Sequence, residues 1–284
     1  MRWEGGRRSD NVEDYRGSRF GGGGLKLGIG GTLIALVAAY FLGIDPRVIL
    51  GLAQSGGGAG IEQEAPQSGA IEDRAGQFIQ VVAADTEDTW SAIFQANGSQ
   101  YTPPKVDLFT QQINTGCGFA DSGVGPFYCP ADRKVYLDPS FFDELATRFQ
   151  APGDFANAYV IAHEVGHHVQ NLLGIERKVR AAQERASDTE RNQLQVRMEL
   201  QADCFAGVWA HHADRARQII EQGDVEAALN AASAVGDDTI QRRTQGHVVP
   251  DSFTHGSAKQ RMTWFKRGLD TGNVGDCDTF SGAN

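Results

Sequence analysis

One stretch of the chain is apolar without interruption. Residues 27–44 (LGIGGTLIALVAAYFLGI) carry no charged side chain, and Tyr40 and Phe41 lie near one end. A helix of this length spans about 27 Å, close to the hydrocarbon thickness of a bilayer, and aromatic residues gather at such ends. A buried core helix and a cleaved signal peptide are the alternatives, but the stretch is too uniformly apolar for the first and lacks the cleavage site of the second. The pattern predicts a transmembrane helix over residues 25–45.

The segments on either side of this stretch are polar. Residues 1–24 are rich in glycine and show no apolar face, which predicts a disordered head, and residues 46–70 are mostly small and polar, which predicts a flexible linker. Six Lys and Arg residues precede the apolar stretch, whereas Arg47 alone follows it closely. By the positive-inside rule we expect a single-pass protein of the cell membrane, with a cytoplasmic N-terminus and a periplasmic C-terminal domain.

After residue 70 the hydrophobic spacing predicts one folded domain, residues 71–284. Apolar positions between residues 71 and 94 recur at helical spacing. Residues 105–137 form short apolar runs separated by Gly, Pro and Asp, as in strands joined by turns. From residue 139 the pattern is helical almost to the end of the chain. Strands followed by helices predict an α+β fold that is mostly helical with a small sheet.

Composition narrows the classes of function. The chain has 284 residues, a formal net charge of −10 and a hydrophobic fraction of 40%. The acidic balance argues against a nucleic-acid partner, because nucleic-acid binders need a basic surface. The hydrophobic fraction is too high for a wholly disordered chain. Composition indicates no particular oligomeric state.

The sharpest chemical signal is the motif His163-Glu164-x-x-His167. A helix is expected around it, with Asp154 as the N-cap and Gly174 as the stop. Histidines four residues apart share one face of a helix and can bind one zinc ion, and the glutamate beside the first can act on a water molecule there. Two exposed histidines on a helix are the alternative, but an apolar helix buries such groups only at a cost if they lack partners.

A catalytic zinc ion needs a third protein ligand and an open position. Glu199 and Asp203 are four residues apart in a later helical stretch and so share a face. We expect Glu199 to be the third ligand and Asp203 to accept the second N–H of a ligating histidine. Competing ligands are His168, which points away from the face of the pair, His211 and His212.

The two motifs together resemble a known family. An H-E-x-x-H motif followed by E-x-x-x-D is the pattern of glutamate-ligand zincins, and the chain resembles the neutral zinc metallopeptidase family (YpfJ-like) of bacterial single-pass membrane proteins. The resemblance covers nearly the whole chain. Besides the head and the apolar stretch, it includes residues 125–130, 162–170, 199–207 and 252–257. It implies a zincin-like fold, one Zn²⁺ ion and hydrolysis of peptide bonds in a protein or peptide substrate, without naming that substrate.

The residues, together with this resemblance, predict a membrane-anchored zinc metalloendopeptidase. Zinc-activated water would attack the peptide bond, with Glu164 as the general base. The oxyanion needs a further donor, for which His255 is the first candidate and Tyr128 and Tyr136 are the rivals. Residues 125–129 are a candidate edge strand for an extended peptide, and a plain structural strand is the alternative.

Four cysteines in a domain outside the cytoplasm predict two disulfides. Cys117 and Cys129 flank a glycine-rich turn, and Cys204–Cys277 would then be the second pair. Three pairings are open from the sequence, and free buried thiols are a further alternative.

Two other functions compete with the peptidase. One is a membrane-tethered scaffold or adaptor with a non-catalytic zinc ion, but Glu164 is present, which favours an enzyme. The other is a zinc amidase acting on cell-wall peptides, but no cell-wall-binding module is recognisable in the sequence.

Overall fold

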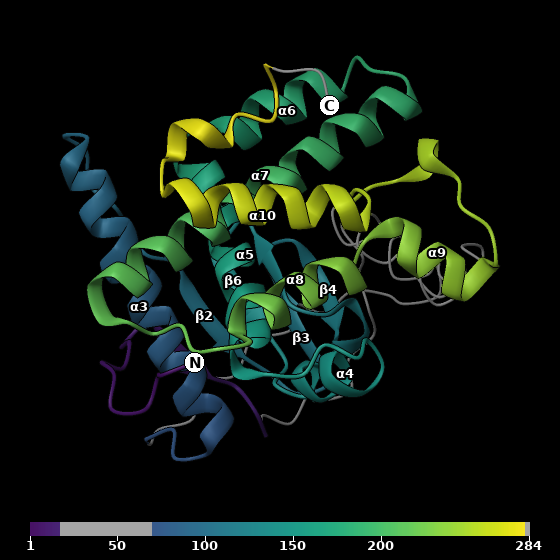
Figure 1. Cartoon of the computed structure of the whole chain (residues 1–284). Coiled ribbons are helices and arrows are strands. Elements are labelled where there is room, and N and C mark those ends of the chain that lie inside the picture. Colours follow the sequence, from purple (N-terminus) through teal and green to yellow (C-terminus); the bar gives the residue numbers. More distant parts are fainter. Residues whose placement is uncertain (18–69, 282–284) are drawn as a thin grey trace. The chain divides into compact units, whose positions relative to one another are not determined.

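The computed structural model describes residues 1–17 and 70–281. These residues fall into two compact units, which we describe separately (Figure 1). The strand unit comprises residues 10–77 and 104–141, and the helical unit comprises residues 1–9, 78–103 and 142–284. The predicted transmembrane helix, residues 25–45, lies outside the described residues. Within the described part of the chain, no helix is both long enough and apolar enough to cross a bilayer.

The strand unit contains a four-stranded sheet in the order β1-β2-β6-β5 and a separate hairpin of β3 and β4. Strands β1, β2 and β6 are parallel, and β5 runs antiparallel to β6 at the edge of the sheet. The bounds are β1 Val12–Asp14, β2 Lys105–Leu108, β3 Gln112–Thr115, β4 Gly118–Asp121, β5 Phe127–Cys129 and β6 Lys134–Leu137, with a 3-10 turn at Ser122–Val124. Phe109, Ile113 and Tyr136 are buried at the centre of a hydrophobic cluster.

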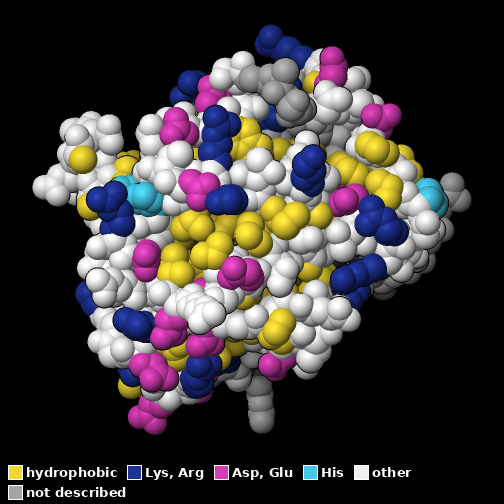
Figure 2. All heavy atoms as spheres, in the orientation of Figure 1, with side chains coloured by type: hydrophobic (Ala, Val, Ile, Leu, Met, Phe, Trp, Pro, Cys, Tyr) yellow, Lys and Arg dark blue, Asp and Glu magenta, His cyan; other side chains and the backbone are white. Residues whose placement is uncertain are grey.

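The helical unit is built around α7, which packs against α5 on one side and α10 on another (Figure 1). The bounds are α3 Arg74–Ala96, α4 Phe141–Thr147, α5 Asp154–Leu172, α6 Ile175–Gln183, α7 Asp188–Arg217, α8 Asp224–Ala234, α9 Asp237–Gln245 and α10 Ala258–Thr271, with 3-10 turns at Pro250–Ser252 and Val274–Cys277. Strands in one stretch and helices in the next confirm the α+β prediction. On the face seen in Figure 2, acidic and basic side chains are interspersed.

Local capping signals define where the principal helices begin. Ser187 starts α7 and Ser257 starts α10, each in a capping box with a Glu or Gln three residues later. The N-cap of α5 is Gly153 rather than the predicted Asp154, which is the first helical residue. The Asp154 carboxylate instead accepts a hydrogen bond of 2.8 Å from Trp3 Nε1, so a tertiary contact takes the place of the expected N-cap hydrogen bond.

Two glycines let the helix backbones approach closely. A Cβ atom at Gly268 of α10 would lie 2.0 Å from the carbonyl oxygen of Cys204 on α7. A Cβ atom at Gly166 of α5, within the histidine motif, would lie 2.9 Å from the carbonyl oxygen of Ala202 on α7. Side chains projecting from α5, α7 and α10 can therefore meet over short distances.

The first seventeen residues belong to the fold, so the prediction of a disordered head is wrong for this part of residues 1–24. Trp3 is buried and its ring packs edge-on against Phe78 at 5.4 Å. Arg7 forms an ion pair of 2.7 Å with Asp88, and β1 pairs with β2. These partners lie more than seventy residues further along the chain, beyond the apolar stretch, so local composition carried no sign of them.

The structure joins the cysteines in the two pairs expected, Cys117–Cys129 in the strand unit and Cys204–Cys277 in the helical unit. The second disulfide ties the C-terminal 3-10 turn to the middle of α7, where its sulfurs lie in the hydrophobic cluster shared with α3 and α5.

Candidate metal centre

The histidine motif lies in the middle of α5, and both imidazoles face the same side of that helix. The ring centroids of His163 and His167 are 4.8 Å apart. Glu199 reaches them from α7, with its Oε2 atom 3.2 Å from Nε2 of His163 and 3.6 Å from Nε2 of His167. The ligand atoms of the three side chains all lie within 4.8 Å of one another. The structure thus brings together the three residues that the sequence proposed as metal ligands.

This donor set fits a zinc ion. Two imidazole nitrogens and one carboxylate are a common protein ligand set of catalytic zinc sites. In both histidines Nδ1 is engaged by another protein group, so Nε2 is the atom turned toward Glu199. His163 and Glu199 are both less than a tenth exposed, which limits the access of bulk water to the ligand atoms.

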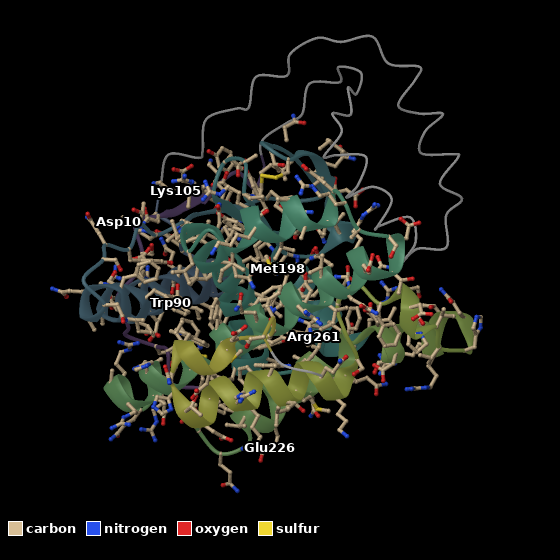
Figure 3. All side chains as sticks on the ribbon, turned by 90° about the horizontal axis from the view of Figure 1, so that it is seen from above. Asp10, Trp90, Lys105, Met198, Glu226 and Arg261 are labelled. Carbon is tan, nitrogen blue, oxygen red and sulfur yellow. A yellow bond between two sulfur atoms is a disulfide. The ribbon has the colours of Figure 1, made fainter. Side chains whose placement is uncertain are left out.

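A buried carboxylate holds the first histidine. Nδ1 of His163 donates to Oδ1 of Asp203 at 2.8 Å, as expected for a group that orients a metal-ligating imidazole. The hydroxyl of Tyr159 also donates to this oxygen, at 2.5 Å. Arg261, which is labelled on α10 in Figure 3, completes the arrangement with two hydrogen bonds to Asp203, 2.8 and 2.9 Å long. Three helices therefore converge on one carboxylate that is fully buried.

The charges of this cluster stabilise one another. Burial by itself would raise the pKa of Asp203, but the Arg261 guanidinium and the His163 imidazole lower it to about 2. Burial by itself would lower the pKa of His163, but Asp203 and Glu199 raise it to about 10. Burial opposes ionisation of Glu199 too, yet the two histidines hold its pKa well below the usual range. Without metal, the site is therefore a buried ion-pair network.

An amide holds the second histidine. Nδ1 of His167 lies 2.8 Å from Oε1 of Gln170, one turn further along α5. Nε2 of Gln170 donates to the carbonyl oxygen of Met198 at 2.7 Å. Nδ1 of His163 therefore has a charged hydrogen-bond partner, the Asp203 carboxylate, whereas Nδ1 of His167 has a neutral one, the Gln170 amide.

Glu164 and His255 each interact electrostatically with a residue of the candidate metal site. Glu164 is buried. Burial by itself would lower the pKa of His167, but Glu199, with a smaller contribution from Glu164, raises it. His255 follows the Pro250–Ser252 turn, and its side chain is 29% exposed. Burial alone would lower its pKa, but Asp237 and Glu199 raise it, so His255 lies within reach of the field of the metal centre.

Asp237, at the start of α9, organises the loop that carries His255. One oxygen of its carboxylate accepts three consecutive backbone N–H groups, from Thr254, His255 and Gly256, at 2.6 to 2.9 Å. The other oxygen lies 3.3 Å from Nδ1 of His255. The loop and the imidazole are therefore positioned by one buried side chain.

The remaining histidine candidates have other partners. His168 is buried with Nε2 on the carbonyl oxygen of Thr102, at 2.7 Å. Nδ1 of His211 and Nε2 of His212 each lie 2.8 Å from a backbone carbonyl oxygen. All three stand apart from the described group of metal-ligating side chains.

The rival oxyanion donors, Tyr128 and Tyr136, belong to the strand unit. The hydroxyl of Tyr136 donates to Asp132 at 2.7 Å, and its ring is buried. Strand β5 is an edge strand of the sheet, as expected for residues 125–129, and its pairing with a peptide stays a prediction.

Sequence reasoning missed Arg261, Gln170 and Asp237. A signal existed for Arg261, because the buried positions of α10 are Ala258, Arg261, Phe265 and Gly268, which form one helical stripe. An arginine within an apolar stripe indicates a buried ion pair.

The whole chain is similar to known proteins. A family described as "putative neutral zinc metallopeptidase" matches residues 1–280. The chain belongs to this family. The uncharacterized protein YpfJ of Escherichia coli strain K12 is 51% identical over 289 residues, covering 99% of this chain and 99% of YpfJ. Uncharacterized proteins of Mycobacterium tuberculosis and Mycobacterium bovis are 41% identical over 260 residues, which is 87% of this chain and 86% of each relative. No solved structure matches the chain.

Metal affinity of this zinc metallopeptidase family member should depend on pH. Because the pKa of His163 is raised to about 10, the metal-free site is protonated at neutral pH, and zinc must displace that proton. We expect zinc affinity to rise by about tenfold per pH unit for each displaced proton between pH 6 and 8. Calorimetry in two buffers of different ionisation enthalpy measures the protons released. An affinity independent of pH would contradict this assignment.

Replacing Arg261 by methionine should destabilise the protein. The buried carboxylate of Asp203 would lose its compensating cation, at a cost of about 3–5 kcal/mol in the free energy of unfolding. Arg242→Met is a matched control, since Arg242 is 62% exposed and pairs with Asp238 on the surface of α9. The control should cost about 1 kcal/mol or less. Urea unfolding of the two metal-free variants makes the comparison, and equal costs would argue against a buried ion pair.

Proposed function

We propose that this chain is a zinc-dependent endopeptidase. The observation that carries the proposal is the meeting of His163 and His167 of α5 with Glu199 of α7, with Glu164 adjacent in the same motif. Membership of a zinc metallopeptidase family supports it. Zinc, when bound by these three side chains, would polarise a peptide carbonyl and make water more acidic.

Glu164 is the proposed proton carrier. As a carboxylate on the helix that bears both histidines, it can accept a proton from the attacking water. The same group then returns the proton to the leaving amine of the cleaved peptide bond. Its burial keeps bulk water from competing for the proton.

His255 is the proposed donor to the oxyanion of the tetrahedral intermediate. Asp237 and Glu199 raise its pKa above the ordinary value, which favours the protonated imidazole with N–H groups to donate. Because Asp237 also binds the backbone of residues 254–256, the donor is fixed in place before substrate binds.

Glu164→Gln should separate metal binding from hydrolysis. We expect the variant to retain zinc and to lose about 10²–10⁴-fold in the rate of peptide cleavage, because the amide cannot accept the proton. Glu184→Gln, an exposed residue just after α6, is the control and should keep full activity. Zinc is measured by elemental analysis and cleavage by mass spectrometry of a peptide library. An active Glu164→Gln variant would remove Glu164 from the mechanism.

Two further variants complete that experiment. Glu199→Ala should lose zinc, and unchanged zinc content would remove Glu199 from the ligand set.

His255→Gln should keep zinc and lower kcat more than it changes KM, because an oxyanion donor acts in the transition state. Zinc binding without any cleavage by the wild type would favour the scaffold function.

We further infer that residues 1–17 and the metallopeptidase domain occupy the same compartment. The support is that β1 pairs with β2 and that Trp3 packs in the helical unit. Arg16 and Asp73, which flank residues 18–69, form an ion pair of 2.7 Å. A single membrane crossing between these flanks would separate groups that are hydrogen-bonded to each other. Two disulfides favour an oxidising compartment, outside the cytoplasm, for both parts.

Cysteine labelling tests this location. Glu4→Cys and Gln222→Cys place an exposed thiol on the head and on the domain. In intact spheroplasts, a membrane-impermeant maleimide should label both variants to the same extent, and lysis should add little. Labelling of Gln222→Cys alone would restore the topology predicted from charge counting, with the head in the cytoplasm.

A further inference from the structure

The amide that holds His167 is part of a longer chain of buried hydrogen bonds. Gln170 is fully buried, and its Nε2 donates to the carbonyl oxygen of Met198 at 2.7 Å and to Oε1 of Gln201 at 3.1 Å. Nε2 of Gln201 in turn donates to the carbonyl oxygen of Cys277 at 2.9 Å. Two glutamines thus connect a proposed zinc ligand to the backbone of the C-terminal turn.

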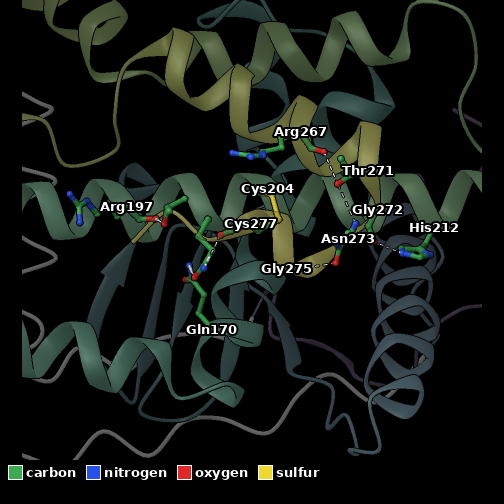
Figure 4. The surroundings of a disulfide bond; sticks show 12 residues. Gln170, Arg197, Cys204, His212, Arg267, Thr271, Gly272, Asn273, Gly275 and Cys277 are labelled. Carbon is green, nitrogen blue, oxygen red and sulfur yellow. Dashed lines mark hydrogen bonds between the residues drawn. A yellow bond between two sulfur atoms is a disulfide. The ribbon is translucent and has the colours of Figure 1, made fainter. Parts of the chain in front are cut away.

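The Cys204–Cys277 disulfide fixes the far end of this chain. It attaches the 3-10 segment that contains Cys277 to α7 (Figure 4). On α7, Cys204 lies one helical turn after Gln201. Both cysteines are fully buried. The acceptor of Gln201 is therefore held at a set distance from the helix that provides Glu199.

The direction of each hydrogen bond in this series, from His167 to Cys277, is determined by the backbone carbonyl groups that accept from the two glutamines. A backbone carbonyl can only accept, so Nε2 of each glutamine must face Met198 or Cys277. Oε1 of Gln170 must then face His167, and because this oxygen also only accepts, Nδ1 of the imidazole must carry the hydrogen. Once zinc displaces the proton on Nε2, this atom of His167 has its lone pair on the side of Glu199, which is the state a zinc ligand requires.

We propose that Gln170, Gln201 and the Cys204–Cys277 disulfide form a positioning device that holds His167 in its metal-binding tautomer, so that zinc affinity depends on this disulfide. The proposal rests on the proposed zinc site but not on peptidase activity. His163 does not share the device, since its partner is the Asp203–Arg261 ion pair. The disulfide thus acts on the metal centre through one histidine.

The test measures zinc affinity by competition with a chromophoric chelator, using the full chain. Gln170→Met removes the acceptor of His167 and should weaken zinc binding by about 10–100-fold. Gln201→Met leaves Gln170 in place but breaks its connection to the turn. The double variant Cys204→Ser/Cys277→Ser keeps both glutamines but detaches the turn from α7. Each should weaken binding by about tenfold.

The second disulfide supplies the matched control. Cys117→Ser/Cys129→Ser removes a crosslink from the strand unit and should leave zinc affinity within about twofold of the wild type, the scatter of context-dependent effects. If the Cys204→Ser/Cys277→Ser variant does not fold, Gln201→Met tests the same connection with both disulfides intact. Far-UV circular dichroism establishes folding before zinc is added.

A tautomer measurement distinguishes positioning from general destabilisation. In the zinc-loaded wild type, long-range ¹H–¹⁵N spectra should show His167 protonated at Nδ1, and Gln170→Met should alter that signal while the signal of His163 keeps its place. If Gln201→Met and the Cys204→Ser/Cys277→Ser variant both bind zinc as tightly as the wild type, the positioning role of the disulfide is wrong, but the zinc site still stands. A wild type that binds no zinc would overturn the zinc site as well.

Discussion

The candidate metal centre depends on one buried carboxylate. Asp203 is fully buried and accepts hydrogen bonds from α5 and α10 while belonging to α7. A carboxylate in such a place must have a cation beside it, because an isolated buried charge costs several kcal/mol or more. Arg261 meets that requirement and also fixes where α10 lies against α7. The position of His163 therefore follows from charge compensation among three helices rather than from α5 alone.

The two histidines of the candidate metal site are held by different kinds of interaction. His163 has an ionised partner, which raises its pKa and increases the electron density on its ring. His167 has Gln170, which adds direction but no net charge. A site with two ionic partners would carry one more buried carboxylate than the present three, with more mutual repulsion in a low dielectric. An ionic hold on one ligand and an amide hold on the other keep both imidazoles oriented without that excess charge.

Sequence patterns predicted the parts of the site that lie on one helix face. His163 and His167, and likewise Glu199 and Asp203, are four residues apart, so helical periodicity alone aligned each pair. Cysteine number predicted two disulfides, but the sequence left three pairings open, and the structure has the pairs Cys117–Cys129 and Cys204–Cys277. Residues that act through tertiary contacts were not predictable in this way. The sequence gives Gln170 no feature that distinguishes it from other helix residues, because its role depends on hydrogen bonds to Met198 and Gln201 of another helix. The order of residues 1–17 was missed for the same reason, since β1 pairs with a strand more than ninety residues away.

The charge pattern of the head also changes meaning once its partners are known. Six basic residues before the apolar stretch favoured a cytoplasmic head by the positive-inside rule. Of these, Arg2, Arg7 and Arg16 are ion-paired with carboxylates elsewhere in the fold. Trp3 also reaches Asp154, the first residue of the helix that carries the histidine motif. A basic residue that completes the fold of the domain is not evidence for the side of the membrane on which the head lies, because folding accounts for its presence. Tertiary pairing should therefore outweigh charge counting when the topology of this chain is assigned.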